Sequence, residues 1–304
     1  MFAPMRGRIH KRNKKMTDEG SSEMPQELEV GTQEGADLRA AVLAKIRAEA
    51  PRFLYKYREG SQQDLDAIAA GKIWIPAACK LGDPHDANLE IRTELAEEWE
   101  HRESVFERDH WGEIVNECFS FGSADPLSEA AVAAIKERAR QLKERVRHFG
   151  VYCLSATGVD AKMWTNFANK FEGICIEYPY MKEIFDTRDG SWRVNKVNYV
   201  AEYPRIDLGL LEREPPGLGH WKLFFHKAED YEYEREWRYV EPKGGEALFD
   251  QPVAISRIIF GLRCSEEKRD AIRRLCVQKQ PRIKCAELRT VRGSYAYEMV
   301  DMTS

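Results

Sequence analysis

Short apolar runs bounded by turn residues are the feature that most restricts the fold of this chain. FLYKY (53–57) and KIWIP (72–76) have the aromatic and branched composition of strands. Between them, Ser61 and Asp64 have capping-box spacing at the start of a helix that Gly71 ends. The opening of the domain is therefore predicted to be a strand–helix–strand unit.

Short apolar runs separated by turn residues continue to the end of the chain. Further strands are expected at 151–157, 173–178, 196–203, 231–240, 254–261, 282–288 and 295–300. Helices are expected after Asp160 and Ser265, which have the side chains of N-caps. Many short strands with few helices predict an α+β fold with mixed or antiparallel sheets.

The domain organisation follows from charge and composition. Residues 1–16 carry six Lys and Arg without an acid, and residues 17–37 carry seven Asp and Glu without a base. Such a segment with few aromatics is expected to be a disordered arm, which leaves 38–304 as one domain. Residues of about 88–148 are highly charged with helical periodicity, and they predict a helical insertion.

Composition excludes some classes of protein. A chain that is 43% hydrophobic and 32% charged, with no run of about 18 apolar residues, predicts a globular protein that does not span a membrane. The seven cysteines stand singly, which favours free thiols and a cytoplasmic location. The net charge of −4 gives no support for a DNA-binding body, and the scattered histidines predict no metal site.

The loop LGDPHD places two carboxylates, Asp83 and Asp86, on either side of a proline. Asp-Pro is typical of a turn, and an Asx-type turn is one interpretation of this loop. The other places the two carboxylates at the mouth of a pocket or on a cation.

Two stretches in the middle of the chain contain candidate ligand contacts. Ser155 and Thr157 are two apart in a predicted strand and continue its apolar face, so both hydroxyls need partners. Met163, Trp164, Phe167 and Phe171 form a helical stripe of the kind that packs in a core. Trp164 is also placed to present one ring face to a ligand.

The stretch YEYEREWRYV (231–240) alternates acidic residues with aromatic ones, which predicts a strand. In a strand, Glu234 and Glu236 lie on one face, with Arg238 as the natural partner of Glu236 and with Glu232 solvated. Lys227 is close in sequence. The stretch is either an exposed strand with salt bridges or a pair of carboxylates gathered for chemistry.

Several segments together resemble a bacterial family known only as a domain of unknown function, from about Phe53 to Tyr297: FLYKYR, GKIWIP, GDPHD, CLSAT, MWTNFANKFEGICIEY, FFHKAEDYEYEREWRYV and IIFG. More distantly, the chain resembles the ADP-ribosyltransferase fold. In that fold an early strand carries Arg or His, a middle strand carries Ser and Thr or Tyr, and a late strand carries Glu. The resemblance implies a split sheet and an enzyme that transfers ADP-ribose from NAD.

The resemblance assigns catalytic roles to residues of the late and middle strands. Glu236 would stabilise the positive charge that develops on ribose as nicotinamide leaves. Glu234 would accept a proton from the acceptor. Ser155 or Thr157 would orient Glu236.

The same resemblance implies how a nucleotide would be bound. Arg58 would hold the pyrophosphate with its planar fork of donors. Tyr55 or Trp164 would stack on nicotinamide or adenine. NAD is then the expected substrate and no metal is required, with a protein or a nucleic acid as the acceptor.

Two other functions fit the same residues. A nuclease or other nucleic-acid enzyme would hold Mg²⁺ with Asp83, Asp86, Glu234 and Glu236, assisted by Lys227. A sensor or interaction domain, in bacterial defence or stress response, would instead use the helical insertion as a partner surface.

Overall fold

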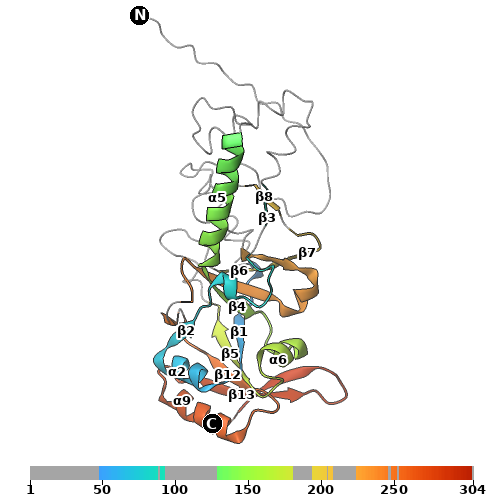
Figure 1. Cartoon of the computed structure of the whole chain (residues 1–304). Coiled ribbons are helices and arrows are strands. Elements are labelled where there is room, and N and C mark those ends of the chain that lie inside the picture. Colours follow the sequence, from blue (N-terminus) through green and yellow to red (C-terminus); the bar gives the residue numbers. More distant parts are fainter. Residues whose placement is uncertain are drawn as a thin grey trace, which may run out of the picture.

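The computed structural model describes residues 48–87, 90–92, 129–180, 194–203, 205–207, 224–245, 248–251 and 253–302. The arm predicted at 1–37 lies outside these residues, as does most of the helix expected at 38–50. Of the predicted insertion, the structure describes a short strand and one long helix. Figure 1 shows the chain with its elements labelled.

The helices and strands confirm the predicted α+β class. The helical elements are α2 (Gln62–Ala70), η1 (Ala78–Lys80), α5 (Glu129–Arg147), α6 (Ala161–Phe167), η4 (Glu229–Glu234) and α9 (Glu266–Gln278). The strands are β1 (Phe53–Arg58), β2 (Lys72–Trp74), β3 (Glu90–Arg92), β4 (Gly150–Ser155), β5 (Ile174–Pro179), β6 (Val194–Lys196), β7 (Asn198–Val200), β8 (Arg205–Asp207), β9 (His226–Ala228), β10 (Glu236–Glu241), β11 (Leu248–Asp250), β12 (Arg257–Phe260), β13 (Lys284–Thr290) and β14 (Tyr297–Asp301).

Local signals in the sequence form the helix ends as predicted. The Ser61 side chain accepts from the backbone of Asp64 while the Asp64 side chain accepts from the backbone of Ser61, which completes the capping box. Gly71 ends α2 in the left-handed region at φ 66°. The side chains of Asp160 and Ser265 cap α6 and α9 by accepting from the backbone N–H groups of Met163 and Lys268. These caps fix where each helix joins its neighbouring strands.

One eight-stranded sheet organises the domain, in the order β14-β13-β12-β5-β1-β4-β10-β6. Its neighbours are antiparallel except for β12 and β13, which are parallel and joined through α9. Three two-stranded sheets complete the described part, namely β11-β2, β3-β8 and β7-β9. The sheet is thus mostly antiparallel and built from short strands, as the sequence predicts.

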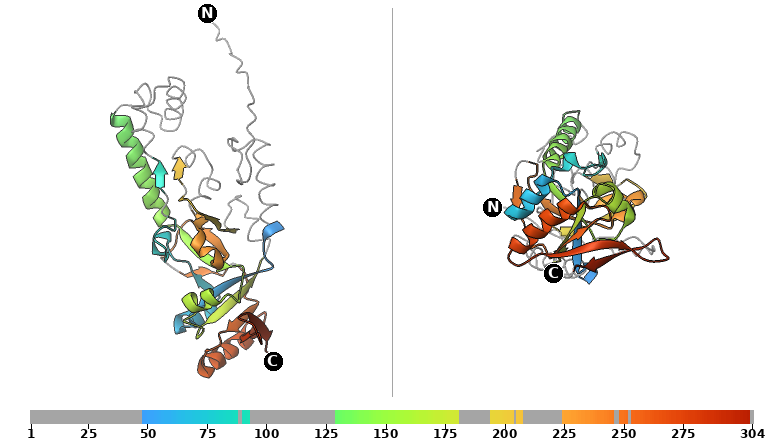
Figure 2. Two further views of the ribbon diagram at one scale, coloured as in Figure 1. Left: turned by 90° about the vertical axis from the view of Figure 1, so that its right-hand side faces the viewer. Right: turned by 90° about the horizontal axis from the view of Figure 1, so that it is seen from below.

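Helices cover both faces of the large sheet (Figures 1 and 2). Residues of α2 and α9 pack with Tyr152, Ile174 and Ile258 on one face. Residues of α6 pack with Tyr55 and other side chains of the opposite face. The lower end of α5 packs on Val151 with Phe224. The face under α6 is the one that carries Ser155 and Glu236, because Tyr55, Ser155 and Glu236 are paired in register across β1, β4 and β10.

The two central strands of this sheet separate. Strands β1 and β4 share a single paired position, Tyr55 with Ser155, whereas β1 and β5 pair at every residue of β1. Beyond that point the Lys56 amine donates to the carbonyl of Cys153 at 2.7 Å. The Lys56 side chain therefore bridges β1 and β4 close to the position where β10 begins.

Among the described residues, Trp164 is the largest side chain that is fully buried, and it packs in the core beneath α6. It is 0% exposed, its indole N–H donates to the carbonyl of Gly158 at 2.9 Å, and its ring stacks on Phe171 and meets Tyr57 edge-on. The predicted core stripe is confirmed for Trp164 and Met163, whereas Phe167 is exposed.

We expect Trp164→Ala to lower the free energy of unfolding by about 3–5 kcal/mol, because it removes a large side chain from a packed core. Trp74→Ala is the matched control, since Trp74 is 41% exposed, and it is expected to cost less than about 1 kcal/mol. Urea unfolding of both variants measures the difference. Equal losses would mean that Trp164 is not part of the core.

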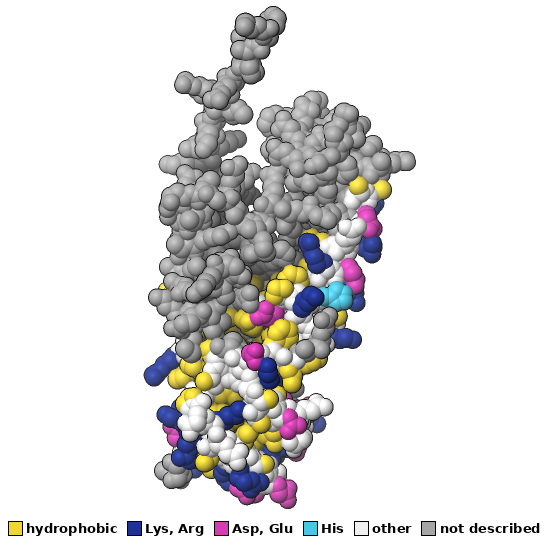
Figure 3. Space-filling view, turned by 90° about the vertical axis from the view of Figure 1, so that its left-hand side faces the viewer, with side chains coloured by type: hydrophobic (Ala, Val, Ile, Leu, Met, Phe, Trp, Pro, Cys, Tyr) yellow, Lys and Arg dark blue, Asp and Glu magenta, His cyan; other side chains and the backbone are white. Residues whose placement is uncertain are grey.

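Basic and acidic side chains are intermixed over the described part of the face in Figure 3. That face therefore lacks the continuous basic stripe typical of nucleic-acid binding, at least where the chain is described.

Candidate functional site

The prediction of a strand at 231–240 is wrong for the first half of this segment. Residues Glu229–Glu234 form the 3-10 helix η4, and β10 begins only at Glu236. Arg235, between them, has the left-handed φ of 44° that turns the chain from helix to strand. Glu234 and Glu236 are therefore not neighbours on one strand face, although both are buried, and Glu232 is solvated as predicted.

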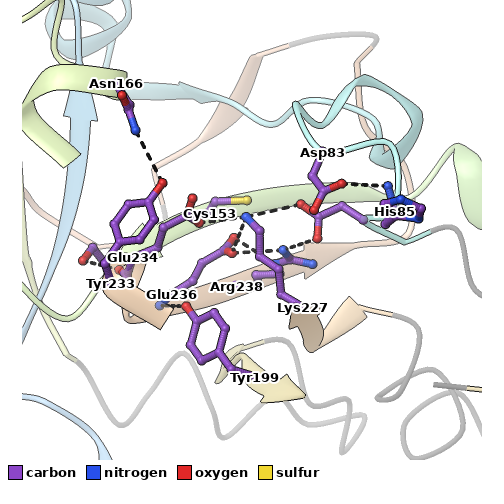
Figure 4. A network of polar contacts seen from close by, with 12 residues as sticks. Asp83, His85, Cys153, Asn166, Tyr199, Lys227, Tyr233, Glu234, Glu236 and Arg238 are labelled. Atoms are coloured by element: carbon purple, nitrogen blue, oxygen red, sulfur yellow. Dashed lines mark hydrogen bonds and ion pairs between the residues drawn. The ribbon is translucent and has the colours of Figure 1, made fainter. Parts of the chain in front are cut away.

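The hydroxyls of Ser155 and Tyr199 hold this junction in place, and Figure 4 shows Tyr199 beside Glu236. The Ser155 hydroxyl, fully buried, donates to the backbone carbonyl of Glu234 at 2.6 Å. The backbone N–H of Glu236 donates to the hydroxyl of Tyr199 at 2.8 Å. The partner that a buried Ser155 requires is thus the backbone of the helix that presents Glu234.

Lys227, from β9, gathers three carboxylates around one amine. Its Nζ lies 2.7 Å from Glu234 Oε2, 3.4 Å from Glu236 Oε2 and 3.5 Å from Asp86 Oδ2. The side chain of Lys227 is only 8% exposed, and those of the three acids are as buried. A buried amine with this arrangement stays protonated, since the three carboxylates outweigh the effect of burial and raise the pKa of Lys227.

Arg238 is the second cation and the more deeply buried. Its Nε and Nη2 donate to the two oxygens of Glu236 at 2.8 and 3.0 Å. Nη2 also donates to Asp86 Oδ1 at 2.6 Å, and Nη1 donates to the carbonyl of Phe224 at 2.7 Å. The predicted pairing of Arg238 with Glu236 on one strand face is confirmed. These four contacts make Arg238 the bridge between the strand and the Asp86 loop.

We name these five residues, Asp86, Lys227, Glu234, Glu236 and Arg238, the charge cluster. Three carboxylates against two cations leave a formal charge of −1 in a site with little solvent. Such an excess of negative charge favours a cation or a developing positive charge nearby.

The three carboxylates of the charge cluster differ in pKa. Burial favours the neutral form of Glu236, but Arg238 and Lys227 outweigh it and lower the pKa of Glu236 to about 2. Burial raises the pKa of Glu234, and Lys227 only partly offsets this effect. Burial also raises the pKa of Asp86, and Arg238 and Lys227 only partly offset this effect. Glu236 is therefore the permanent anion, and Glu234 is the carboxylate better suited to accepting a proton.

The structure does not bring Arg58 into this site. Arg58 is three residues from Tyr55 on β1, so its side chain lies on the opposite face of the sheet. There it lies against the ring of Tyr152 and 3.7 Å from Asp64. Arg58 therefore cannot share a ligand contact with Glu236 in this arrangement.

The other residues predicted to contact a nucleotide are buried or hydrogen-bonded within the protein. Tyr55 lies on the same sheet face as Ser155, but it is 8% exposed and its hydroxyl donates to Glu177 at 3.2 Å. The Thr157 hydroxyl accepts from the backbone of Val159, which makes it part of a turn. Trp164 has no exposed ring face, as described above. None of these three side chains is therefore free to bind a nucleotide in the described structure.

The two carboxylates of the LGDPHD loop have different roles, one in a turn and one in the charge cluster. Asp83 accepts from the backbone N–H of His85 at 2.9 Å, which is the Asx-type turn predicted for this loop. Asp86 is instead buried in the charge cluster. Asp83 and Asp86 are therefore not joined in one set of ligands.

Two residues of the site were missed by sequence reasoning. The Tyr199 hydroxyl accepts from Glu236, and the Cys153 thiol donates to the carboxylate of Glu236. Cys153 was identifiable, because it is two residues from Ser155 on the same strand face. Tyr199 lies on the separate short strand β7, and no local pattern marks it.

Comparison of the chain with family models, with curated proteins and with solved structures gives no match. Among the described residues, no helix has the length and apolar character needed to cross a bilayer. Within the same residues, no group of three or more His, Cys, Asp or Glu has the arrangement of a metal site.

Proposed function

We propose that this chain cleaves the bond between nicotinamide and ribose in NAD and transfers ADP-ribose to water or to a macromolecular acceptor. The observation that carries the proposal is the buried charge cluster, in which Glu236 is a permanent carboxylate within an excess of negative charge. Within this cluster, Glu236 is paired in register with Ser155, at the end of β4 where β1 and β4 share their paired position.

The reaction breaks the bond from ribose C1′ to the nicotinamide nitrogen, and the bonding electrons leave with nicotinamide. Positive charge then develops on C1′ and the ring oxygen, as in glycoside transfer. A fixed anion beside that charge stabilises the transition state more than the ground state. Glu236 supplies this anion, because its carboxylate is held by Arg238 and stays ionised.

The acceptor oxygen forms the new bond to C1′ and must lose a proton. Glu234 takes this role because its pKa is raised toward the working pH, whereas that of Glu236 is lowered. Lys227 contacts both carboxylates and fixes their separation. Arg58 has no part in this proposal, since it lies on the other sheet face.

The division of roles predicts a pH dependence. Activity requires ionised Glu234, so kcat should fall as the pH drops through a pKa above the usual 4.5, while Glu236 remains ionised to about pH 2. We expect a slope of one on the acid side in the wild-type profile and its loss in Glu234→Gln. An acid limb that persists unchanged in Glu234→Gln would remove the base role from Glu234.

A metal-dependent phosphodiesterase is the second candidate, and the burial of Asp86 beside Glu234 and Glu236 favours it. In this arrangement the amine of Lys227 occupies the point that the three carboxylates share. A divalent ion would have to displace that amine, which makes this candidate the weaker one.

A single assay separates the two candidates. Purified protein is incubated with NAD in a chelator, with and without cell extract as acceptor, and in parallel with RNA and DNA in Mg²⁺. Nicotinamide release in the chelator supports the first candidate. The second candidate would replace the first if NAD stays intact in every arm and nucleic acid is cleaved in Mg²⁺. That cleavage should disappear in Asp86→Asn.

A further inference from the structure

One side chain of β6 that the proposed reaction does not use has a buried donor with no partner in the described part of the chain. Asn195 pairs directly with Arg238 across β10 and β6, so the two side chains lie on the same face of the sheet. Asn195 is 0% exposed. Its Oδ1 accepts from the backbone of Lys196 at 2.7 Å, while its Nδ2 has no hydrogen-bond partner among the described residues.

An amide donor in that position is costly to the free protein. A buried N–H without an acceptor loses its bonds to water and gains nothing in return. Buried polar groups in folded proteins are otherwise nearly always satisfied. The free donor of Asn195, one strand away from the charge cluster, is therefore placed to meet an acceptor that arrives with a ligand.

The charge of the cluster restricts which ligand acceptor can bind the Asn195 donor. Its formal charge of −1 repels phosphate and carboxylate oxygens, and both of its cations are already engaged by carboxylates. A neutral carbonyl or hydroxyl oxygen carries no such penalty. If that oxygen belongs to a cationic ligand, the cluster attracts the ligand as a whole.

We propose that Asn195 is a substrate-binding residue that donates through Nδ2 to a neutral oxygen of the nicotinamide riboside half of NAD. That half offers a carboxamide oxygen on the positively charged nicotinamide ring and the hydroxyls of the attached ribose. The inference rests on the proposed function and adds to it which end of the dinucleotide faces β6.

Carbocyclic NAD is the probe that tests the inference, because it keeps these oxygens and the positive ring but its C–N bond resists cleavage. Isothermal titration gives its Kd for the wild type, for Asn195→Ala and for the control Asn198→Ala, whose side chain is exposed. Loss of one hydrogen bond to the ligand should raise the Kd of Asn195→Ala about 5- to 10-fold. Asn198→Ala should bind as the wild type does.

NADH provides a second readout, since it has the same oxygens on an uncharged ring. The wild type should bind NADH more weakly than carbocyclic NAD, and Asn195→Ala should weaken both by the same factor. If Asn195→Ala fails to fold, the near-isosteric Asn195→Leu carries the test, because it fills a similar volume and removes the donor.

The outcomes separate the inference from the proposed function. Tight binding of the probe to the wild type, with an unchanged Kd in the Asn195 variants, would overturn the role of Asn195 and leave the reaction standing. No binding of the probe to the wild type would overturn both. Weaker binding in the Asn195 variants alone supports the assignment.

Discussion

Arg238→Met is expected to lower the free energy of unfolding by about 3–5 kcal/mol, because it removes one of the two cations that pair with the buried carboxylates. Arg238 is 0% exposed and bonds to Glu236, to Asp86 and to the carbonyl of Phe224. Methionine has a similar volume, so the loss reports charge and hydrogen bonds more than packing. Urea unfolding at neutral pH measures it.

A control and a rescue make this result specific. Arg274→Met replaces an exposed arginine of α9 and should change stability by less than about 0.5 kcal/mol. Adding Asp86→Asn and Glu236→Gln to Arg238→Met should restore part of the loss, because no unpaired charge then remains buried. A loss below about 1 kcal/mol for Arg238→Met, or no recovery in the triple variant, would contradict a tightly paired cluster.

Glu236→Gln is expected to lower the rate of nicotinamide release about 10²- to 10³-fold, which is typical when one preorganised electrostatic contact to a transition state is removed. The amide keeps the shape of the side chain but loses its charge and one of the two acceptors that Arg238 uses. Because the lost interaction acts on the developing cation, kcat should fall while KM changes little.

Glu232→Gln is the matched control for Glu236→Gln, since Glu232 is exposed and four residues earlier. It should retain wild-type rates. Thermal unfolding of both variants shows whether a lower rate comes from loss of folded protein. Equal rates in Glu236→Gln and wild type would mean that Glu236 serves only as the structural partner of Arg238.

Local signals made much of the fold predictable. Ser61, Asp64 and Gly71 have side chains or conformations that determine helix ends without help from distant residues. The failure came at 231–235, where alternating residues suggested a strand but a 3-10 helix formed. The left-handed turn at Arg235 that divides the two is not marked by a glycine, so the sequence carries no sign of it.

The site was predictable in part. The pairing of Arg238 with Glu236 followed from strand parity alone. The same parity, counted from Tyr55, would have placed Arg58 on the other face of the sheet. The contacts of Asp86 with Lys227 and Arg238 join segments far apart in the chain, and no local pattern specifies such contacts.

The most direct test of the account is a single-turnover assay, with purified protein in excess over NAD labelled in the nicotinamide ring and a chelator present. We expect the wild type to release labelled nicotinamide and leave ADP-ribose, free or on an acceptor, and Glu236→Gln to do so at least about 10²-fold more slowly. Label that stays in intact NAD with the wild type, both alone and with cell extract, would contradict it.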